Sequence, residues 1–329
     1  MPLINRCGGG GGTPQLCGQV ENFKAGLGNL SAILSWTAPS PDEDNSFAGT
    51  RIVRKTGSAP TSIHDGTVVY EGTALTYTDT GLTSGTTYYY RAFAYNAKKK
   101  YQTEYRVINK TAVALNPNFA SNTWELIMEV CQGGSVPDTW VTGDSKIMTI
   151  DGADYQFDIV GKNHDTYAAG GIAPLTFGLH DCYGTTYPMN SSNTNSTGWN
   201  GSKMRTETLP AILAKMPENI QNGIRAVNKL TATSGTNSTI KTASDKLFTF
   251  SEMEVYGSTT YSCSGEGKQY DYYKAGNSKV KKVGSTASWW WLRSPLRNIN
   301  GYFCAVYTDG SVTYYNASDS GGVCFGFCF

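Results

Sequence analysis

The stretch "DTGLTSGTTYYYRAFAYN", residues 79–96, decides the fold of the first part of the chain, because a glycine- and threonine-rich turn leads into a run of alternating side chains. In an extended strand, successive side chains point to opposite faces. One face therefore carries Tyr90, Ala92 and Ala94, and the other carries Tyr89, Arg91 and Phe93. The segments "SAILSWTAP", "GTRIVRKTG", "TVVYEG" and "LTYTDTG" alternate in the same way between Gly, Pro and Asp breaks. Short strands at this spacing predict a β-sandwich over residues 19–115.

Two details of this region resemble a fibronectin type III domain. Trp36, which precedes a proline, is similar to the core tryptophan of that domain's second strand, and Leu82 with Tyr88 is similar to its tyrosine corner. The resemblance implies an all-β, immunoglobulin-like sandwich. Such modules serve as spacers or adhesion units, so this domain alone predicts no ligand.

Length and composition exclude several classes of function. A chain of 329 residues predicts two domains. The net charge of +1 leaves no basic excess for nucleic acid or an anionic membrane, so neither is an expected partner. No stretch has the ~18 apolar residues of a membrane-spanning helix, and the first residues lack the apolar core of a secretory signal. The eight cysteines show no CxxC spacing, which favours reduced, buried thiols over a zinc module.

The remaining sequence divides into three further segments. Residues 1–18 contain five consecutive glycines and are predicted to be an N-terminal attachment segment, either a flexible tether or an ordered assembly element. Residues 116–121 have the Asn, Pro and Ser content of a linker. A second domain then spans residues 122–329, and its first strands surround "DSKIMTIDGADYQFDIVGKNHD".

The second domain mixes helical and strand patterns. Residues 201–230 space their apolar side chains as in two amphipathic helices, with Ser202 capping the first and Pro217 beginning the second. Ser251 and Glu254 have the spacing of a capping box for one further short helix. Strand patterns follow, so the mixed order predicts an α+β domain.

The motif "SWWWLRSP", residues 288–295, concentrates aromatic mass next to an arginine. Large rings usually dominate a core, so Trp289, Trp290 and Trp291 are predicted to be buried. Arg293 is then a candidate donor to nearby backbone carbonyls.

Six segments of this domain, as an ordered set, resemble the C-type-lectin-like domains of phages and bacteria, which are related in fold to the formylglycine-generating enzyme. They are "FDIVGKNHD", "LTFGLHDC", "MNSSNTNSTGWNGSKMR", "LFTFSEMEVYG", "WWLRSP" and "GGVCFGFCF". The chain departs from the family where Cys324 and Phe325 replace the usual Arg-Pro near the end. The resemblance implies a lectin-like fold with a binding surface on its final strands. It extends to variable proteins of diversity-generating retroelements, in which adenines of a C-terminal segment are rewritten.

Rewriting at adenines makes a prediction about composition. An AAC or AAT codon changed at its adenines can encode neither Lys, Glu, Gln, Met nor Trp. These types make up 50 of the 329 residues, so residues 296–329 should contain about five of them by whole-chain average. They contain none. A β-rich tail also disfavours Lys and Glu, so the observation agrees with a variable region over residues 297–319 without requiring it.

The hairpin in this region presents the candidate recognition residues. Asp309-Gly310 predicts a two-residue type I′ turn that pairs Tyr307 with Val312 and Ala305 with Tyr314. Neither resulting face is cleanly polar, so periodicity leaves the exposed face open. Bulky amphipathic and small polar side chains are typical of antibody-like binding surfaces. The candidate ligand-binding residues are Arg297, Asn298, Asn300, Tyr302, Tyr307, Asp309, Tyr314, Tyr315, Asn316, Ser318 and Asp319.

An enzyme is the competing class. The pairs His164-Asp165 and His180-Asp181 are neighbours in sequence, but neighbours on a strand point to opposite faces and make no dyad. Cys324 and Cys328 are too far apart on one strand to share a metal ion unless the chain bends. Glu252 and Glu254 are a carboxylate pair of the kind glycosidases use, but a capping box already explains one of them. We expect no catalytic residue, metal or cofactor.

The resemblance to the C-type-lectin-like variable proteins implies a phage tail receptor-binding protein that binds a host cell-surface receptor. We expect it in the virion, after synthesis in the bacterial cytoplasm, as a homotrimer joined to other tail proteins through its N-terminal segment. A bacterial cell-surface adhesin and an enzyme acting on sulfatases or glycans remain the alternatives. The sequence does not distinguish a protein receptor from a glycan.

Overall fold

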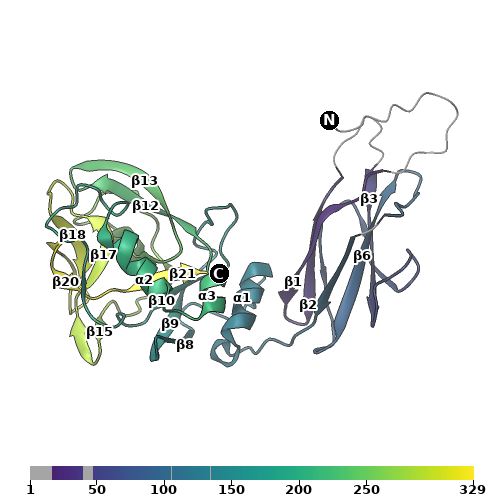
Figure 1. Cartoon of the computed structure of the whole chain (residues 1–329), viewed down its shortest axis with the longest axis horizontal. Coiled ribbons are helices and arrows are strands. Elements are labelled where there is room, and N and C mark those ends of the chain that lie inside the picture. Colours follow the sequence, from purple (N-terminus) through teal and green to yellow (C-terminus); the bar gives the residue numbers. More distant parts are fainter. Residues whose placement is uncertain (1–16, 40–46, 105, 134) are drawn as a thin grey trace, which may run out of the picture. The chain divides into compact units, whose positions relative to one another are not determined.

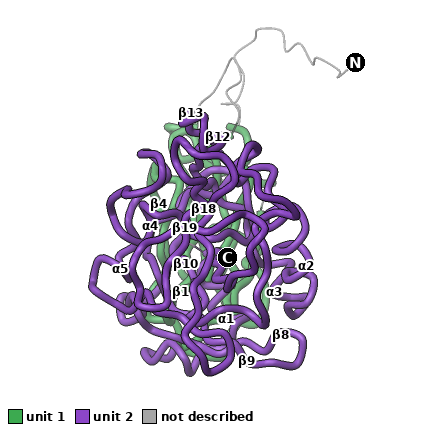
Figure 2. The backbone as a smooth tube through the Cα atoms, turned by 90° about the vertical axis from the view of Figure 1, so that its left-hand side faces the viewer, with its two compact units in different colours: residues 1–115 green, residues 116–329 purple. Residues whose placement is uncertain are grey.

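The computed structural model describes residues 17–39, 47–104, 106–133 and 135–329, which form two compact units that divide after Leu115 (Figure 2). The predicted attachment segment, residues 1–18, lies almost wholly outside the described residues. Its last two residues, Cys17 and Gly18, are described, and Cys17 is buried in the core of the first unit, where its carbonyl accepts a hydrogen bond from Gln102. The sandwich therefore includes Cys17, two residues before its predicted start.

The first unit is the predicted sandwich of two antiparallel sheets (Figure 1). One sheet has the order β1-β2-β5 and the other β4-β3-β6-β7. The strands are β1 (Glu21–Gly28), β2 (Ser31–Thr37), β3 (Phe47–Thr56), β4 (Thr67–Gly72), β5 (Thr76–Asp79), β6 (Thr87–Asn96) and β7 (Arg106–Thr111).

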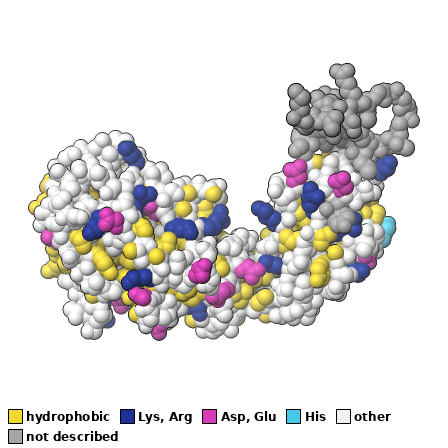
Figure 3. All heavy atoms as spheres, viewed as in Figure 1, with side chains coloured by type: hydrophobic (Ala, Val, Ile, Leu, Met, Phe, Trp, Pro, Cys, Tyr) yellow, Lys and Arg dark blue, Asp and Glu magenta, His cyan; other side chains and the backbone are white. Residues whose placement is uncertain are grey.

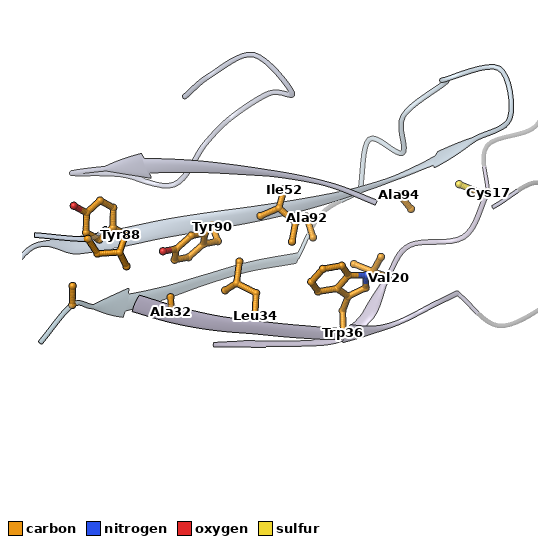
Figure 4. Packing of buried hydrophobic residues seen from close by; sticks show 12 residues of the cluster. Cys17, Val20, Ala32, Leu34, Trp36, Ile52, Tyr88, Tyr90, Ala92 and Ala94 are labelled. Atoms are coloured by element: carbon orange, nitrogen blue, oxygen red, sulfur yellow. The ribbon is translucent and has the colours of Figure 1, made fainter. Parts of the chain in front are cut away.

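Alternation along β6 builds the core of this unit, as predicted. Tyr90, Ala92 and Ala94 point to the interior, where they meet Trp36 of β2 (Figure 4). The Tyr88 hydroxyl accepts a hydrogen bond from the Thr83 N–H at 3.1 Å, which forms the predicted tyrosine corner.

The second unit begins at Asn116, so the predicted linker 116–121 belongs to it. Phe119, in the short helix η1 (Phe119–Ser121), is buried and packs against Trp140 and Phe177. Helix α1 (Trp124–Gly133) follows, where no helix was predicted. Its buried residues Trp124, Ile127, Val130 and Cys131 recur at helical spacing. Asn118 and Asn122 cap η1, and asparagine is common both in helix caps and in linkers, which explains why this segment resembled a linker.

A five-stranded antiparallel sheet forms the centre of the second unit. Its order is β14 (Phe248–Thr249), β21 (Phe325–Cys328), β10 (Leu175–Leu179), β9 (Ala153–Lys162) and β8 (Ser145–Ile150). The C-terminal strand β21 pairs with both β10 and β14, and all residues from Gly321 to Phe329 are buried. The end of the chain is thus part of the core.

Short helices and two-stranded ribbons surround this sheet. The region predicted as two helices contains the π-helical turn η2 (Met204–Thr208), α2 (Leu209–Leu213) and α3 (Glu218–Gly223). The Ser202 hydroxyl caps η2, and Pro217 precedes α3, close to the predictions. The apolar spacing after residue 226 belongs to a strand instead. The remaining elements are β11 (Tyr187–Pro188), β12 (Val227–Ser234), β13 (Asn237–Asp245), α4 (Glu252–Tyr256), α5 (Asp271–Lys274), β15 (Lys281–Val283), β16 (Thr286–Ser288) and β20 (Ser320–Gly321).

A three-stranded antiparallel sheet carries the candidate recognition residues. Its order is β17 (Trp290–Pro295), β18 (Tyr302–Val306) and β19 (Val312–Asn316), so β19 is an edge strand. The unit as a whole is mostly β-sheet with short helices. Within the described residues, no helix has the length and apolar character needed to span a membrane.

Candidate recognition surface

The β18–β19 hairpin has a three-residue loop in place of the predicted two-residue turn. Ser311 accepts a hydrogen bond from the Tyr307 N–H, and the Gly310 N–H donates back to Tyr307. Gly310 has φ +85°, the left-handed conformation that glycine adopts without strain, as in a type I turn followed by a bulge. The Asp309 carboxylate accepts from the Ser311 N–H at 2.8 Å and fixes the loop.

The longer loop shifts the register by one residue from the prediction. Val306 pairs with Val312, Cys304 with Tyr314 and Tyr302 with Asn316. A one-residue shift moves a whole strand's side chains to the other face. Tyr314 therefore shares a face with Tyr302, whereas the sequence placed it with Phe303 and Tyr307. Thr313 and Tyr315 lie on the face of Phe303.

Tyr302 and Tyr314 form a tyrosine cluster with a third ring, Tyr261. The ring centroids of Tyr261 and Tyr314 are 5.0 Å apart, and those of Tyr302 and Tyr314 are 5.7 Å apart, both in edge-to-face contact. Tyr314 keeps 40% of its surface exposed. Tyr261 comes from the loop after α4 and was not predicted as a site residue. No sequence signal marks it, because it lies about forty residues before the hairpin.

On the opposite face, Tyr315 stacks on Trp289. Their rings are nearly parallel, with an interplanar angle of 19° and centroids 3.9 Å apart. Trp289 is only half-buried, whereas Trp290 and Trp291 are fully buried. The prediction that all three tryptophans are core is therefore wrong for Trp289. Tyr307, 42% exposed, follows the same face at the loop.

The other predicted residues mostly hold the surrounding loops. Asn300 accepts from the Asn195 N–H, Ser318 donates to Asn193, and Asp319 accepts from the N–H of Asn316. Asn298 has φ +65°, a conformation that asparagine tolerates in turns, and its N–H donates to Gly235. Arg297 is exposed beside the Tyr261 carbonyl.

All eleven predicted residues are thus exposed or half-buried and lie on or beside β19. Figure 3 shows side chains of the hydrophobic class, which there includes tyrosine, at the margin where Figure 1 labels β18 and β20, among few charged groups. The sequence missed the partners from distant loops: Tyr261, Trp289, Asn193 and Asn195. We call the set of Tyr261, Trp289, Tyr302, Tyr307 and residues 312–316 the edge-strand surface.

Strand β17 is the opposite edge strand of this sheet, and its buried side chains anchor the sheet to the rest of the unit. The indole N–H groups of Trp290 and Trp291 donate to the carbonyls of Lys279 and Tyr187. The guanidinium of Arg293 donates to the carbonyls of Leu230, Thr249 and Glu266, as predicted. Every residue of β17 is buried.

Arg293 also belongs to a buried network of charges. It makes a bidentate ion pair with Glu254, at 2.6 and 2.8 Å. The Lys229 ammonium lies 2.6 Å from Glu254 and 2.8 Å from Asp165. Tyr270 donates to Asp165 at 2.7 Å. All five side chains are almost completely buried, so each charge depends on its partners for the solvation that water no longer supplies.

The pKa values in this network follow from burial and pairing. Burial alone raises the pKa of Asp165, but the ammonium of Lys229 and its hydrogen bonds outweigh burial and lower that pKa to about 2. For Glu254 burial is likewise outweighed, by Arg293 and then Lys229, so its pKa is lowered. Both carboxylates are therefore ionised at neutral pH. Glu254 completes the predicted capping box with Ser251 as well.

Glu252 connects this network to the edge-strand surface. Its N–H donates to the hydroxyl of Ser294, a residue of β17. Its carboxylate accepts from the N–H groups of Tyr261 and Ser262, at 3.1 and 2.6 Å. A buried carboxylate that accepts several backbone N–H groups holds a loop firmly. The motif in β17 thus positions Tyr261 through Glu252, and Tyr261 in turn contacts Tyr314.

The candidate catalytic and metal-binding residues are dispersed. His164 stacks on Tyr270, and the thiols of Cys324 and Cys328 are buried, which raises the pKa of Cys324 to about 11. Among the described residues, no group of three His, Cys, Asp or Glu side chains is arranged to hold a metal ion.

His180 has a carboxylate partner, Asp158, whose oxygen lies 2.8 Å from its Nδ1. Asp181, its neighbour in sequence, instead accepts from the Lys282 N–H. The hydrogen bond to Asp158 raises the pKa of His180. His180 lines a pocket of about 350 Å³, together with Asp154, Tyr155 and Lys282 among others.

Residues 176–327 match the model of DUF6273, a domain of unknown function, and this range includes the whole edge-strand surface. No curated protein matches the chain. Similar solved structures include a fibronectin type III domain of the human fibronectin type III domain containing protein 3, with 17% identity, 34% of this chain and 100% of that chain covered, and a TM-score of 0.27. The sixth such domain of that protein has 18% identity, 33% and 93% coverage, and a TM-score of 0.25.

A third similar structure is the spore cortex lytic enzyme SleM of Clostridium perfringens, with 13% identity and a TM-score of 0.24. The match covers 29% of this chain and only 28% of SleM. Strand order and the tyrosine corner make the first unit fibronectin type III-like. At this level of similarity, the neighbours say nothing about what either unit binds.

Proposed function

We propose that the chain is a receptor-binding adhesin of a phage tail, which binds a host cell-surface receptor through the edge-strand surface. The observation that carries the proposal is the contrast within one sheet. Tyr302, Tyr307, Tyr314 and Tyr315 are accessible on or beside an edge strand, while the strand two positions away is completely buried. Tyrosine offers a large contact area with little loss of side-chain entropy, as in antibody binding sites.

The finer proposal is a C-type-lectin-like second unit whose residues 297–319 vary by adenine rewriting. Two observations support it. The six motifs occur in the family's order, and residues 296–329 lack all five residue types that rewritten asparagine codons cannot encode. Accessible positions in this range tolerate replacement far better than buried ones.

The first unit fits the role of a spacer that carries the second unit away from its attachment point. The proposal also includes attachment to other tail proteins through residues 1–18, a homotrimer, and location in the virion. A trimer would raise avidity by about 10²–10⁴ where several weak sites engage one cell surface. A bacterial surface adhesin would use the same edge-strand surface.

One observation favours an enzyme as the second candidate. His180 is held by buried Asp158 at the rim of a pocket that is large enough for a sugar unit. A histidine with a raised pKa beside a carboxylate is a common acid–base pair. A glycan-cleaving activity lost in His180→Gln, with cell binding intact, would identify this function.

The proposal is tested by binding of the purified full chain to a panel of bacterial strains. We expect binding to a susceptible strain, and its loss in the double variant Tyr314→Ala plus Tyr315→Ala, with the circular dichroism spectrum unchanged. The matched control is Ile147→Ala plus Ile172→Ala, which removes exposed hydrophobic side chains elsewhere in the same unit. Equal binding by the tyrosine variant and the control would overturn the site assignment.

A further inference from the structure

The outer edge of β19 has backbone groups that no other strand of the described chain pairs with. Antiparallel pairs alternate between residues that bond to each other and residues whose N–H and C=O point away. Tyr307 bonds to Ser311, and Gly301 bonds to Ala317. Counting by two along the hairpin, residues 313 and 315 bond inward to β18. The N–H and C=O groups of Val312, Tyr314 and Asn316 therefore point outward.

A side chain satisfies the outward N–H group at one end of this edge, while the outward groups at its centre have no hydrogen-bond partner among the described residues. The Asn316 N–H is bonded by Asp319, whose carboxylate also accepts from the Asn316 side chain. In the described part of the chain, no hydrogen bond reaches the outward groups of Val312 and Tyr314. These two residues offer two donors and two acceptors along one line.

This edge lacks the features with which proteins usually prevent strand addition. Edge strands are commonly protected by lysine, proline or a bulge. The sequence of β19 is "VTYYN", and its pairing with β18 runs without a register shift. The loop bulge at Gly310 lies outside the strand, where the Tyr256 hydroxyl holds it by donating to the Gly310 carbonyl.

We propose that the receptor segment recognised by this surface is an extended protein strand, which adds to β19 as a fourth strand of the β17-β18-β19 sheet. This inference rests on the proposed function and names the class of partner. Outward groups on Val312 and Tyr314 repeat every second residue, and an extended peptide presents its own groups with the same repeat. A glycan has no backbone with this spacing of alternating donors and acceptors.

The added strand would place its side chains alternately on the two faces already described. One set would lie over the cluster of Tyr261, Tyr302 and Tyr314, and the other beside Tyr315 and Trp289. Backbone bonds would then supply affinity that is independent of the residues at 312–316, while the side chains would select the sequence. A surface built in this way keeps its mode of attachment when its side chains change.

The test uses Val312, which is the first residue of an edge strand and whose N–H points outward, so proline is tolerated there. Val312→Pro removes one outward donor, and the matched control Val312→Thr keeps it with a β-branched side chain. The probe is a display library of short random linear peptides, selected on the immobilised full chain. Selected peptides should bind Val312→Pro about tenfold more weakly than Val312→Thr, the loss expected for one hydrogen bond, because both variants lose the valine side chain and they differ in the outward donor.

A second measurement does not depend on the folding of the proline variant. N-methylation of a selected peptide, one residue at a time, should weaken binding to the unaltered chain at every second position. Failure to select peptides, equal binding to Val312→Pro, or no alternation on N-methylation would each overturn the proposal. So would sedimentation showing that the unaltered chain dimerises and Val312→Pro does not, because β19 would then pair with a second copy.

Cell binding distinguishes a failure of the added-strand proposal from a failure of the proposed adhesin function. If Val312→Pro still binds cells that the double tyrosine variant does not, the adhesin stands and the added strand is wrong. If the unaltered chain binds no strain in the panel, the proposed function itself fails.

Discussion

Strands β17 and β19 belong to the same three-stranded sheet, and they differ in almost every physical respect. All six residues of β17 are buried, whereas none of the five residues of β19 is. Arg293 of β17 has a bidentate partner and three backbone carbonyls, while the Tyr314 ring makes edge-to-face contacts with two other tyrosines. We therefore propose that β17 holds the fold and that the residues of β19 can be replaced. One strand, β18, lies between them.

The largest expected effect comes from breaking the charge network behind β17. Glu254→Gln leaves Arg293 and Lys229 buried with a lost countercharge, so we expect the free energy of unfolding to fall by about 3–5 kcal/mol. Urea denaturation of the full chain measures it. Glu207→Gln, at an exposed carboxylate, is the control and should change the free energy by less than about 0.5 kcal/mol. Equal losses of unfolding free energy in the two variants would show that the buried network stabilises the fold no more than an exposed carboxylate does.

A smaller effect is expected where the two strands are connected. Glu252→Gln replaces a carboxylate that accepts from the N–H groups of Tyr261 and Ser262 with an amide that accepts less strongly. We expect a loss of about 2 kcal/mol, the contribution of hydrogen bonds to a charged group. Cell binding should weaken as well, because Tyr261 loses its position against Tyr314. If Glu252→Gln lowers the stability but leaves cell binding unchanged, Glu252 does not position the edge-strand surface.

The same substitution, tyrosine to phenylalanine, can be made in the buried charge network and on β19. Tyr270→Phe deletes a buried hydroxyl that donates to Asp165 and accepts from Lys229, and should cost about 1–3 kcal/mol. Tyr314→Phe deletes a hydroxyl on a 40% exposed ring and should cost less than about 0.5 kcal/mol. Thermal unfolding of the two variants in parallel measures the difference. Similar losses would contradict the division between the strands.

The smallest effect concerns His180, away from both strands. Its hydrogen bond to Asp158 raises its pKa in the folded state. The stabilisation by this pair is therefore fully present below the unfolded pKa of about 6.5 and is lost as pH rises through the higher folded value. Because His180 is half-exposed, we expect under about 1 kcal/mol. Thermal unfolding of His180→Gln should lose the decline in stability that the unaltered chain shows from about pH 6 to pH 8.

Local patterns predicted the parts of the fold that depend on neighbours in sequence. Alternation predicted which side chains of β6 share a face, and the structure shows that the face of Tyr90 is the interior one. The spacing of Ser251 and Glu254 predicted the capping box. The hairpin shows the limit of such patterns. Asp309-Gly310 suits both a two-residue turn and a three-residue loop with a bulge, and only packing of the flanking strands decides between them. The wrong choice placed Tyr314 on the wrong face.

Long-range partners were beyond reach of the sequence. Nothing near Arg293 shows that Glu254 is its carboxylate partner or that Lys229 shares it. Trp289 is the same residue type as Trp290 and Trp291, yet it is only half-buried and stacks on Tyr315. Tyr261 reaches the hairpin only because Glu252 holds its loop. These contacts depend on the folded chain.

Saturation substitution of residues 290–295 and 312–316, scored for folding by protease resistance of the displayed full chain, tests the central claim most directly. We predict that most substitutions at Val312, Thr313 and Tyr314 leave the protein resistant to protease, while nearly all substitutions in β17 abolish this resistance. Equal intolerance in the two strands would show that β19 is part of the core that holds the fold, and would contradict a replaceable recognition surface.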